Sequence, residues 1–122
     1  MKRVLDVGQC GMDHGSIRRL IERAFDAEVA QAHDLAGALE QLRNGSFDLV
    51  LVNRKFDADY SDGLELIKRI KDDGTLAGTP VMLVSNFADA QQQAVAVGAE
   101  AGFGKAELSA PATQERLAKF LA

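Results

Sequence analysis

Asp48-Leu-Val-Leu-Val-Asn53 is the stretch that decides the fold of this 122-residue chain. Four consecutive apolar residues are typical of a strand that is covered on both faces, as in a parallel sheet. Apolar residues at helical spacing flank the stretch on both sides, and they are Leu35, Ala38, Leu39 and Leu42 before it and Leu64, Leu66, Ile67 and Ile70 after it. The stretch is therefore predicted to be a central strand between two amphipathic helices.

The same alternation of short apolar runs and amphipathic helices continues in both directions along the chain. The other predicted strands span residues 4–7, 28–32, 80–85 and 101–104, and further helical stripes begin at Ile17, Ala90 and Leu117. Asp34 is the expected N-cap of the second helix, and Asn44-Gly45 is its expected end. Five β-α units of this kind predict one doubly wound α/β domain over residues 1–122. Its flavodoxin-like parallel sheet should have the strand order 2-1-3-4-5, as the middle of three layers, with a site at the carboxyl ends of strands one and three.

Composition and charge limit the classes of function. Fourteen basic and eighteen acidic side chains give a net charge of −4, and the basic residues are scattered, so nucleic acid is not an expected direct partner. No stretch approaches the ~20 apolar residues of a membrane-spanning helix, and Asp6 interrupts the apolar start that a secretory signal would need. The single Cys10 excludes an internal disulfide. A cytoplasmic location without membrane attachment is the resulting expectation.

Several segments resemble the receiver domain of two-component response regulators, the CheY-like family. Met1-Lys-Arg-Val-Leu-Asp-Val-Gly-Gln9 follows the layout of the family's first strand, and residues 48–53 follow that of its third. Later family segments are matched by Asp62-Gly-Leu-Glu-Leu66, Pro80-Val-Met-Leu-Val-Ser85 and Gly98-Ala99 followed by Lys105. The resemblance covers nearly the whole chain. It implies a CheY-like (βα)5 fold and a role in bacterial-type two-component phosphorelay signal transduction.

The acidic residues of the family's site are replaced at the matching positions. The resemblance places Asn53 at the phosphoacceptor aspartate, and Gly8 and Gln9 at the acidic pair that holds the metal. Phosphoryl transfer to a carboxylate needs an anionic nucleophile and a hard divalent cation such as Mg²⁺. An amide at position 53 is a poor nucleophile, and the metal loses its charged ligands. We therefore expect no catalytic residue, no metal or other cofactor and no enzymatic activity.

Two residues of the family's pocket are retained, and a third position has changed. Ser85 matches the hydroxyl at the end of the fourth strand, and Lys105 matches the pocket lysine. Gly102 occupies the position of the switch aromatic, three residues before Lys105. Because a hydroxyl and a lysine also suit the rim of such a sheet, their presence alone does not indicate function. Lys105 is expected to face no carboxylate cluster.

Three functions are compatible with this pattern. The leading one is a pseudo-receiver, a phosphorylation-independent protein-interaction module that binds a histidine kinase, another receiver or an output domain. Its contacts should involve the face of the fourth helix, fifth strand and fifth helix, which also suits a homodimer. The first alternative is a working phosphoacceptor receiver that uses Asp57 or Asp59, in a loop before Asp62 that is about two residues longer than usual. The second alternative is a small flavodoxin-like ligand-binding protein, with a flavin or nucleotide at the rim.

Four further polar residues are candidates for a role in the protein: Asp6, Cys10, His14 and His33. Asp6 lies within a strand that should be buried, where an unpaired carboxylate is costly, so it should reach a lysine or arginine at the rim or be partly protonated. A relocated metal site that combines Asp6 with Asp57 or Asp59 is disfavoured. Cys10 lies in the first loop, where a lone cysteine is usually inert. His14 and His33 are expected to have capping or surface roles.

Overall fold

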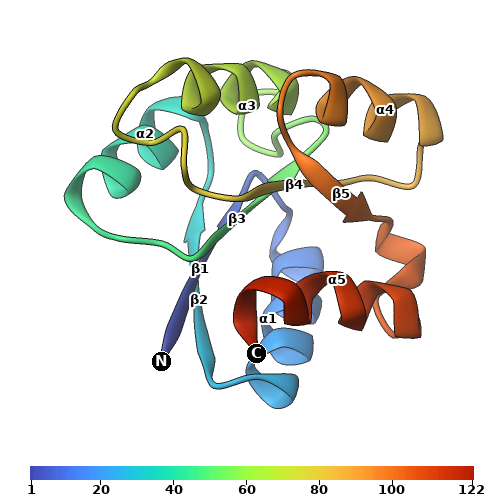
Figure 1. Cartoon of the computed structure of the whole chain (residues 1–122). Helices are drawn as coiled ribbons and strands as arrows, with labels where there is room; N and C mark the ends of the chain where they lie inside the picture. The colour runs from blue at the N-terminus through green and yellow to red at the C-terminus, as the bar shows by residue number, and fades with distance from the viewer.

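The computed structural model describes all 122 residues and contains one five-stranded parallel sheet in the order β2-β1-β3-β4-β5 (Figure 1). The strands are β1 (Lys2–Val7), β2 (Ala27–Ala32), β3 (Leu49–Asn53), β4 (Val81–Val84) and β5 (Glu100–Phe103). The helices are α1 (Gly11–Ala24), α2 (Leu35–Asn44), α3 (Gly63–Asp72), α4 (Ala88–Ala96) and α5 (Pro111–Leu121), with a short 3₁₀ helix η1 (Lys105–Glu107) before α5. The predicted fold class and strand order are confirmed.

The sheet is the middle of three layers. Helices α2, α3 and α4 cover one of its faces, and α1 and α5 cover the other (Figure 1). Successive side chains of a strand point to opposite faces, so Val50 and Val52 enter the first core while Leu49 and Leu51 enter the second. All four side chains are fully buried. This double burial explains why residues 49–52 include no polar residue.

Short side chains fix where several helices begin. Asp34 accepts a hydrogen bond from the backbone N–H of Gly37 at 2.8 Å, which confirms the predicted N-cap of α2. Asp62 caps α3 in the same way, through the N–H of Leu64 at 3.0 Å. A short connection precedes α2 and the longer loop 54–62 precedes α3, so the two caps determine where these loops at the carboxyl edge of the sheet end.

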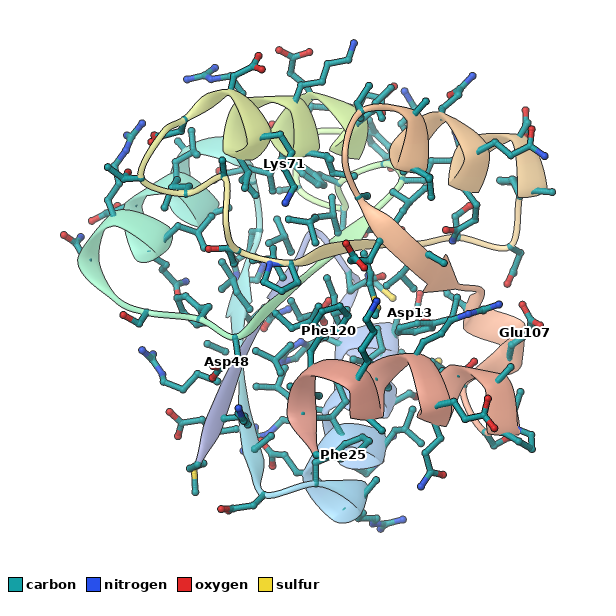
Figure 2. All side chains as sticks on the ribbon, viewed as in Figure 1. Asp13, Phe25, Asp48, Lys71, Glu107 and Phe120 are labelled. Carbon is teal, nitrogen blue, oxygen red and sulfur yellow. The ribbon has the colours of Figure 1, made fainter.

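Lys71 holds the long connection between α3 and β4 in place. Its Nζ donates to the backbone carbonyls of Ala77 at 3.1 Å and Thr79 at 2.9 Å, beneath α3 (Figure 2). The following strand begins at Val81, one residue after the predicted start at Pro80. None of the helices combines the length and the apolar character that crossing a bilayer requires.

Candidate functional site

The carboxyl ends of β1 and β3 lie side by side, and Asn53 joins them. Val7 pairs with Val52 in the sheet, so Gly8 and Asn53 are the next residues at this edge. The Asn53 side-chain amide donates to the carbonyl of Gly8 at 3.0 Å and to that of Lys55 at 2.7 Å. Both amide hydrogens are therefore used to hold two loops together. An ionised carboxylate is an acceptor only and could make neither bond.

Gly8 cannot be replaced by an acidic residue without a rearrangement. Its φ of +79° is in the left-handed region, and a Cβ at this position would collide with the ring of Phe56. Phe56 belongs to the loop after β3 and is fully buried. Backbone bonds from Phe56 N to the Ser61 carbonyl and from Asp57 N to the Gly8 carbonyl, both 2.9 Å, hold the loop over this edge. The aromatic ring thus fills the space beside Gly8.

Gln9 provides the third neutral position of this edge. The residue is buried, and neither its Nε2 nor its Oε1 has a hydrogen-bond partner. Mg²⁺ is bound in proteins through one or two carboxylates together with water and phosphate oxygens. Here Asn53 and Gln9 supply two amides and Gly8 supplies no side chain, and no group of three or more His, Cys, Asp or Glu side chains could hold a metal ion. The residues present do not fit a Mg²⁺ site.

Ser85 and Lys105 do lie beside Asn53, as the resemblance implies. All three line a depression of about 240 Å³ at the carboxyl edge of the sheet, together with Arg54 and Lys55. Ser85 Oγ accepts a hydrogen bond from the N–H of Phe87 at 3.1 Å. No acidic side chain lines the depression. Its character is therefore neutral to basic, which is the opposite of a divalent cation site.

Asp57 and Asp59 do not line that depression. Both are exposed in the loop after β3. The Asp59 carboxylate accepts hydrogen bonds from the Ser61 hydroxyl at 2.6 Å and the Ser61 N–H at 3.0 Å, and these bonds lower the pKa of Asp59. The neighbouring Tyr60 has a φ of 59°, so the loop turns sharply at this point. Asp59 is thereby engaged in a local turn.

A second polar cluster at the same edge was not predicted from the sequence. Fully buried Asp6 places its Oδ2 2.7 Å from Nδ1 of His14, whose side chain is only 13% exposed. Burial raises the pKa of Asp6 to about 6, although His14 and Lys105 each act to lower it. Of the two expectations for Asp6, a pair with a lysine or arginine is wrong because the partner is His14, whereas the raised pKa agrees with partial protonation. The expectation of a capping or surface role for His14 is wrong.

The sequence contained a signal for this pair. Asp6 has the same parity as Val4, whose side chain faces α1, and His14 precedes Ile17 by three residues and Ile21 by seven on the buried stripe of that helix. Both residues should therefore point into the layer between β1 and α1.

Lys105 extends this cluster to the loop after β5. Its Nζ lies 3.0 Å from Oδ2 of Asp13, in the first turn of α1 (Figure 2). Lys105 was expected to face no carboxylate cluster, and it pairs with one carboxylate, that of Asp13. Cys10 is the N-cap of α1, and its Sγ accepts a hydrogen bond from the Asp13 N–H at 3.5 Å. Both Lys105 and Cys10 thus interact with Asp13 in the first turn of α1.

Comparison with known proteins identifies the family. The model of the response regulator receiver domain matches residues 13–119 of the chain. The chain belongs to the response regulator receiver domain family. As a receiver domain it is part of two-component signal transduction, and receivers interact with protein partners such as kinases and output domains.

Solved receiver structures share the fold of this receiver at low sequence identity. The signal receiver domain of a DNA-binding response regulator from Colwellia psychrerythraea 34H is 22% identical, with a TM-score of 0.82 over 98% of this chain and 97% of that chain. A sensor protein from Polaromonas sp. JS666 is 16% identical, with a TM-score of 0.84 over 98% and 94%. Chemotaxis protein CheY4 of Vibrio cholerae is 23% identical, with a TM-score of 0.73 over 98% and 94%.

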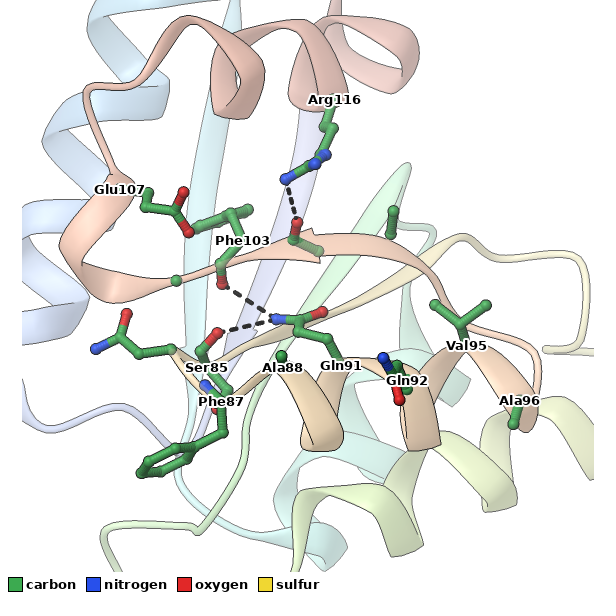
Figure 3. Close-up of a pocket in the computed structure, with 14 residues that line it drawn as sticks. Ser85, Phe87, Ala88, Gln91, Gln92, Val95, Ala96, Phe103, Glu107 and Arg116 are labelled. Carbon is green, nitrogen blue, oxygen red and sulfur yellow. Dashed lines mark hydrogen bonds between the residues drawn. The ribbon is translucent and has the colours of Figure 1, made fainter.

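Gly102, which the resemblance matches to the switch aromatic, has no room for a side chain. A Cβ on Gly102 would collide with the carbonyl oxygen of Leu83 and would lie 2.9 Å from Gln91 Oε1. The Gln91 Nε2 donates to the carbonyls of Leu83 at 2.9 Å, Ser85 at 3.1 Å and Phe103 at 3.3 Å (Figure 3). Gln91 therefore connects α4 to β4 and β5 beside Gly102, where the family has an aromatic residue and this chain has none.

Proposed function

We propose that this receiver is a pseudo-receiver: it accepts no phosphoryl group at position 53, has no enzymatic activity and acts as a phosphorylation-independent protein-interaction module. The observation that carries the proposal is the pair of hydrogen bonds from the Asn53 amide to Gly8 and Lys55. A phosphoacceptor needs a free anionic oxygen at this point. Here the side chain is a neutral donor engaged by two backbone carbonyls.

The neighbourhood of Asn53 supports the proposal independently. A metal-assisted transfer needs cation ligands next to the acceptor. Gly8 supplies none and is packed against Phe56, and Gln9 supplies only a neutral amide. Lys105, which could balance phosphoryl charge, is held by Asp13. Each component of the transfer chemistry is missing or engaged elsewhere.

Partner binding is assigned in this proposal to the face formed by α4, β5 and α5. Phe87, just before α4, is 55% exposed, and Val95 within α4 is 49% exposed. Large exposed apolar side chains on a folded domain mark interaction sites when they lie on one patch. A histidine kinase, another receiver, an output domain or a second copy of the chain could cover this face. Gln91 would hold it in a single arrangement.

An amide NMR titration with Mg²⁺ and then beryllofluoride, a mimic of the bound phosphoryl group, tests the proposal. We expect no saturating shifts of Asn53, Ser85 or Lys105 up to about 10 mM Mg²⁺, far above the range in which a carboxylate-based site would fill. An active receiver titrated in parallel is the positive control. Saturating shifts at these residues would overturn the proposal.

The Asp57→Asn and Asp59→Asn variants extend the same experiment. Acetyl phosphate with Mg²⁺ should give no phosphorylated species of the unaltered chain by intact-mass measurement. If a species 80 Da heavier formed (a single phosphoryl group) and disappeared in one of these variants, the working receiver with a displaced acceptor would replace the proposal. The mass measurement thus distinguishes a pseudo-receiver from a working receiver that is phosphorylated on a displaced aspartate.

A further inference from the structure

A hollow of about 610 Å³ lies between α4 and α5, over β5 (Figure 3). Its volume falls within the roughly 300–1,000 Å³ of sites that bind small molecules. Val95 and Ala96 of α4 form one wall, Phe87 stands at one end, and Ala101 and Gly102 of β5 contribute the floor. The hollow is distinct from the depression beside Asn53, although Ser85 and Phe87 border both.

The hollow is built into the backbone. A Cβ on Gly102 would collide with the Leu83 carbonyl, and one on Gly104 would collide with Asn86 Oδ1. At Gly102 the obstacle is backbone, so a side chain there requires a rearrangement of β4, whereas at Gly104 the obstacle is the end of the flexible Asn86 side chain. The three hydrogen bonds of Gln91 hold α4 at its distance from β5. The cavity therefore exists before any ligand binds, and no group must be ordered to form it.

Two side chains of opposite charge, Arg116 and Glu107, lie at the hollow without an ion-pair partner. Arg116 of α5 donates from Nη1 to the Gly102 carbonyl at 2.8 Å and belongs to no ion pair. Glu107 of η1 places its Oε1 over Gly104, 3.1 Å from where a Cβ would lie, and also belongs to no ion pair. Two residues along a strand span about 7 Å, so the guanidinium and the carboxylate mark opposite ends of the glycine floor.

We propose that this hollow binds a flat, largely apolar small molecule with a carboxylate at one end and an N–H donor at the other. The carboxylate would pair with Arg116, whose planar guanidinium suits a carboxylate. The N–H group would donate to Glu107. The apolar body would lie on the glycine floor against Val95 and Ala96. This site goes beyond the proposed function, which assigns no small molecule to the chain, although Val95 also belongs to the face that is assigned there to a protein partner.

The test uses 6-amino-2-naphthoate as the probe, in an amide NMR titration of the full chain. A ligand of about 14 non-hydrogen atoms with ordinary efficiency should bind with a dissociation constant on the order of 1 mM or below. We expect saturating shifts of Val95, Gly102 and Arg116. The methyl ester of the probe, which lacks the charge, should bind at least about fivefold more weakly. Equal affinity of acid and ester, or no saturation at 10 mM, would overturn the proposal.

Two adjacent residues of α4 supply a matched pair of variants. Gln92 lines the hollow, whereas Gln93 lines a separate depression on the α3 side, and both are exposed. Gln92→Trp should fill the hollow and weaken probe binding at least about tenfold, while Gln93→Trp should leave it within twofold. Equal weakening by the two variants would contradict the assignment. An unchanged unfolding midpoint in urea shows that each variant retains the fold.

The charge assignment is tested separately. Arg116→Gln keeps a donor for the Gly102 carbonyl but removes the positive charge, so the probe should lose its preference over its methyl ester. Arg23→Gln in the last turn of α1, far from the hollow in sequence and on another helix, is the control and should leave the preference intact. A preference that survives in Arg116→Gln would overturn the role of this residue. Neither result bears on Mg²⁺ or beryllofluoride binding, so failure of this site leaves the proposed function standing.

Discussion

Two polar clusters share the carboxyl edge of the sheet, and their chemistry is opposite. The amide cluster, formed by Gly8, Gln9 and Asn53, contains no charge. The ionic cluster contains Asp6, Asp13, His14 and Lys105, and each of its carboxylates lies within 3.0 Å of a basic group. A cation site needs carboxylates whose charge is not already balanced. The difference teaches that acidic residues near a receiver pocket do not make a metal site when each has a basic neighbour.

The Gly8→Asp variant would remove the difference between the two clusters, because it puts a carboxylate into the amide cluster. Of the predicted effects on the free energy of unfolding, this one should be the largest. The new side chain would meet the Phe56 ring and occupy a left-handed backbone position. Overpacking and backbone strain together should cost about 4 kcal/mol of the free energy of unfolding. Urea denaturation measures the loss. Gly11→Asp is the matched control, because a Cβ there meets nothing within 4 Å; equal losses would exclude a role for Phe56.

The pH dependence of stability tests the other half of the comparison, the ionic cluster around Asp6. The pKa of Asp6 is raised from 3.8 to about 6 in the folded chain, so the folded state binds the proton more tightly than the unfolded state. The stability that this proton contributes is complete below about pH 3.8 and is lost as the pH rises through about 6. At 1.36 kcal/mol per pKa unit, the full loss is about 3 kcal/mol.

Asp6→Asn isolates this contribution. Urea unfolding at a series of pH values from 3.5 to 7.5 should show that the stability of the native chain falls relative to the variant as the pH rises. Asp13→Asn, which removes a partly exposed carboxylate of the same cluster, is the control and should follow the native chain through this range. A difference between native chain and Asp6→Asn that is constant with pH would show that the pKa of Asp6 is not raised.

Asn53→Asp places a carboxylate between two carbonyl oxygens. Two donated hydrogen bonds are lost, and the new charge faces the carbonyls of Gly8 and Lys55. We expect a loss of about 2 kcal/mol in urea denaturation at pH 7. Asn44→Asp, an exposed position at the end of α2, should change stability by less than about 0.5 kcal/mol. Phosphorylation should not appear, since the positions of Gly8 and Gln9 would still lack acids; labelling of this single variant would refute the alignment of the first strand.

Lys105→Met should have the smallest effect on stability. The Lys105 and Asp13 side chains are 31% and 36% exposed, and ion pairs of such exposure contribute less than about 1 kcal/mol. Urea unfolding at low and at high salt measures this contribution. The small loss in the free energy of unfolding should be smaller still at 1 M salt, because dissolved ions then screen the attraction between the two charges. A loss above about 2 kcal/mol would show that Lys105 acts mainly on buried Asp6.

The fold was predictable because periodicity and burial act over many residues at once. The continuous apolar run before Asn53 indicated a central strand, and Asp34 marked a helix start by a local hydrogen bond. Of the site, the meeting of Asn53, Ser85 and Lys105 followed from the family layout. The collision between Phe56 and Gly8 did not, because it depends on the path of a longer loop that no periodicity describes. Asp6 and His14 show the intermediate case, in which parity indicated a direction but not a partner.

The packing of Phe56 against Gly8 also governs how this receiver could change by mutation. A carboxylate at position 8 requires that the ring be removed, and removal of the ring alone leaves a cavity that costs about 3–5 kcal/mol. Each single step toward an acidic site thus passes through a less stable protein, whichever step comes first. The two positions are epistatic, and a marginally stable domain cannot easily cross such a valley. While the Phe56 ring fills this space, a stable protein with an acid at position 8 requires changes at both positions.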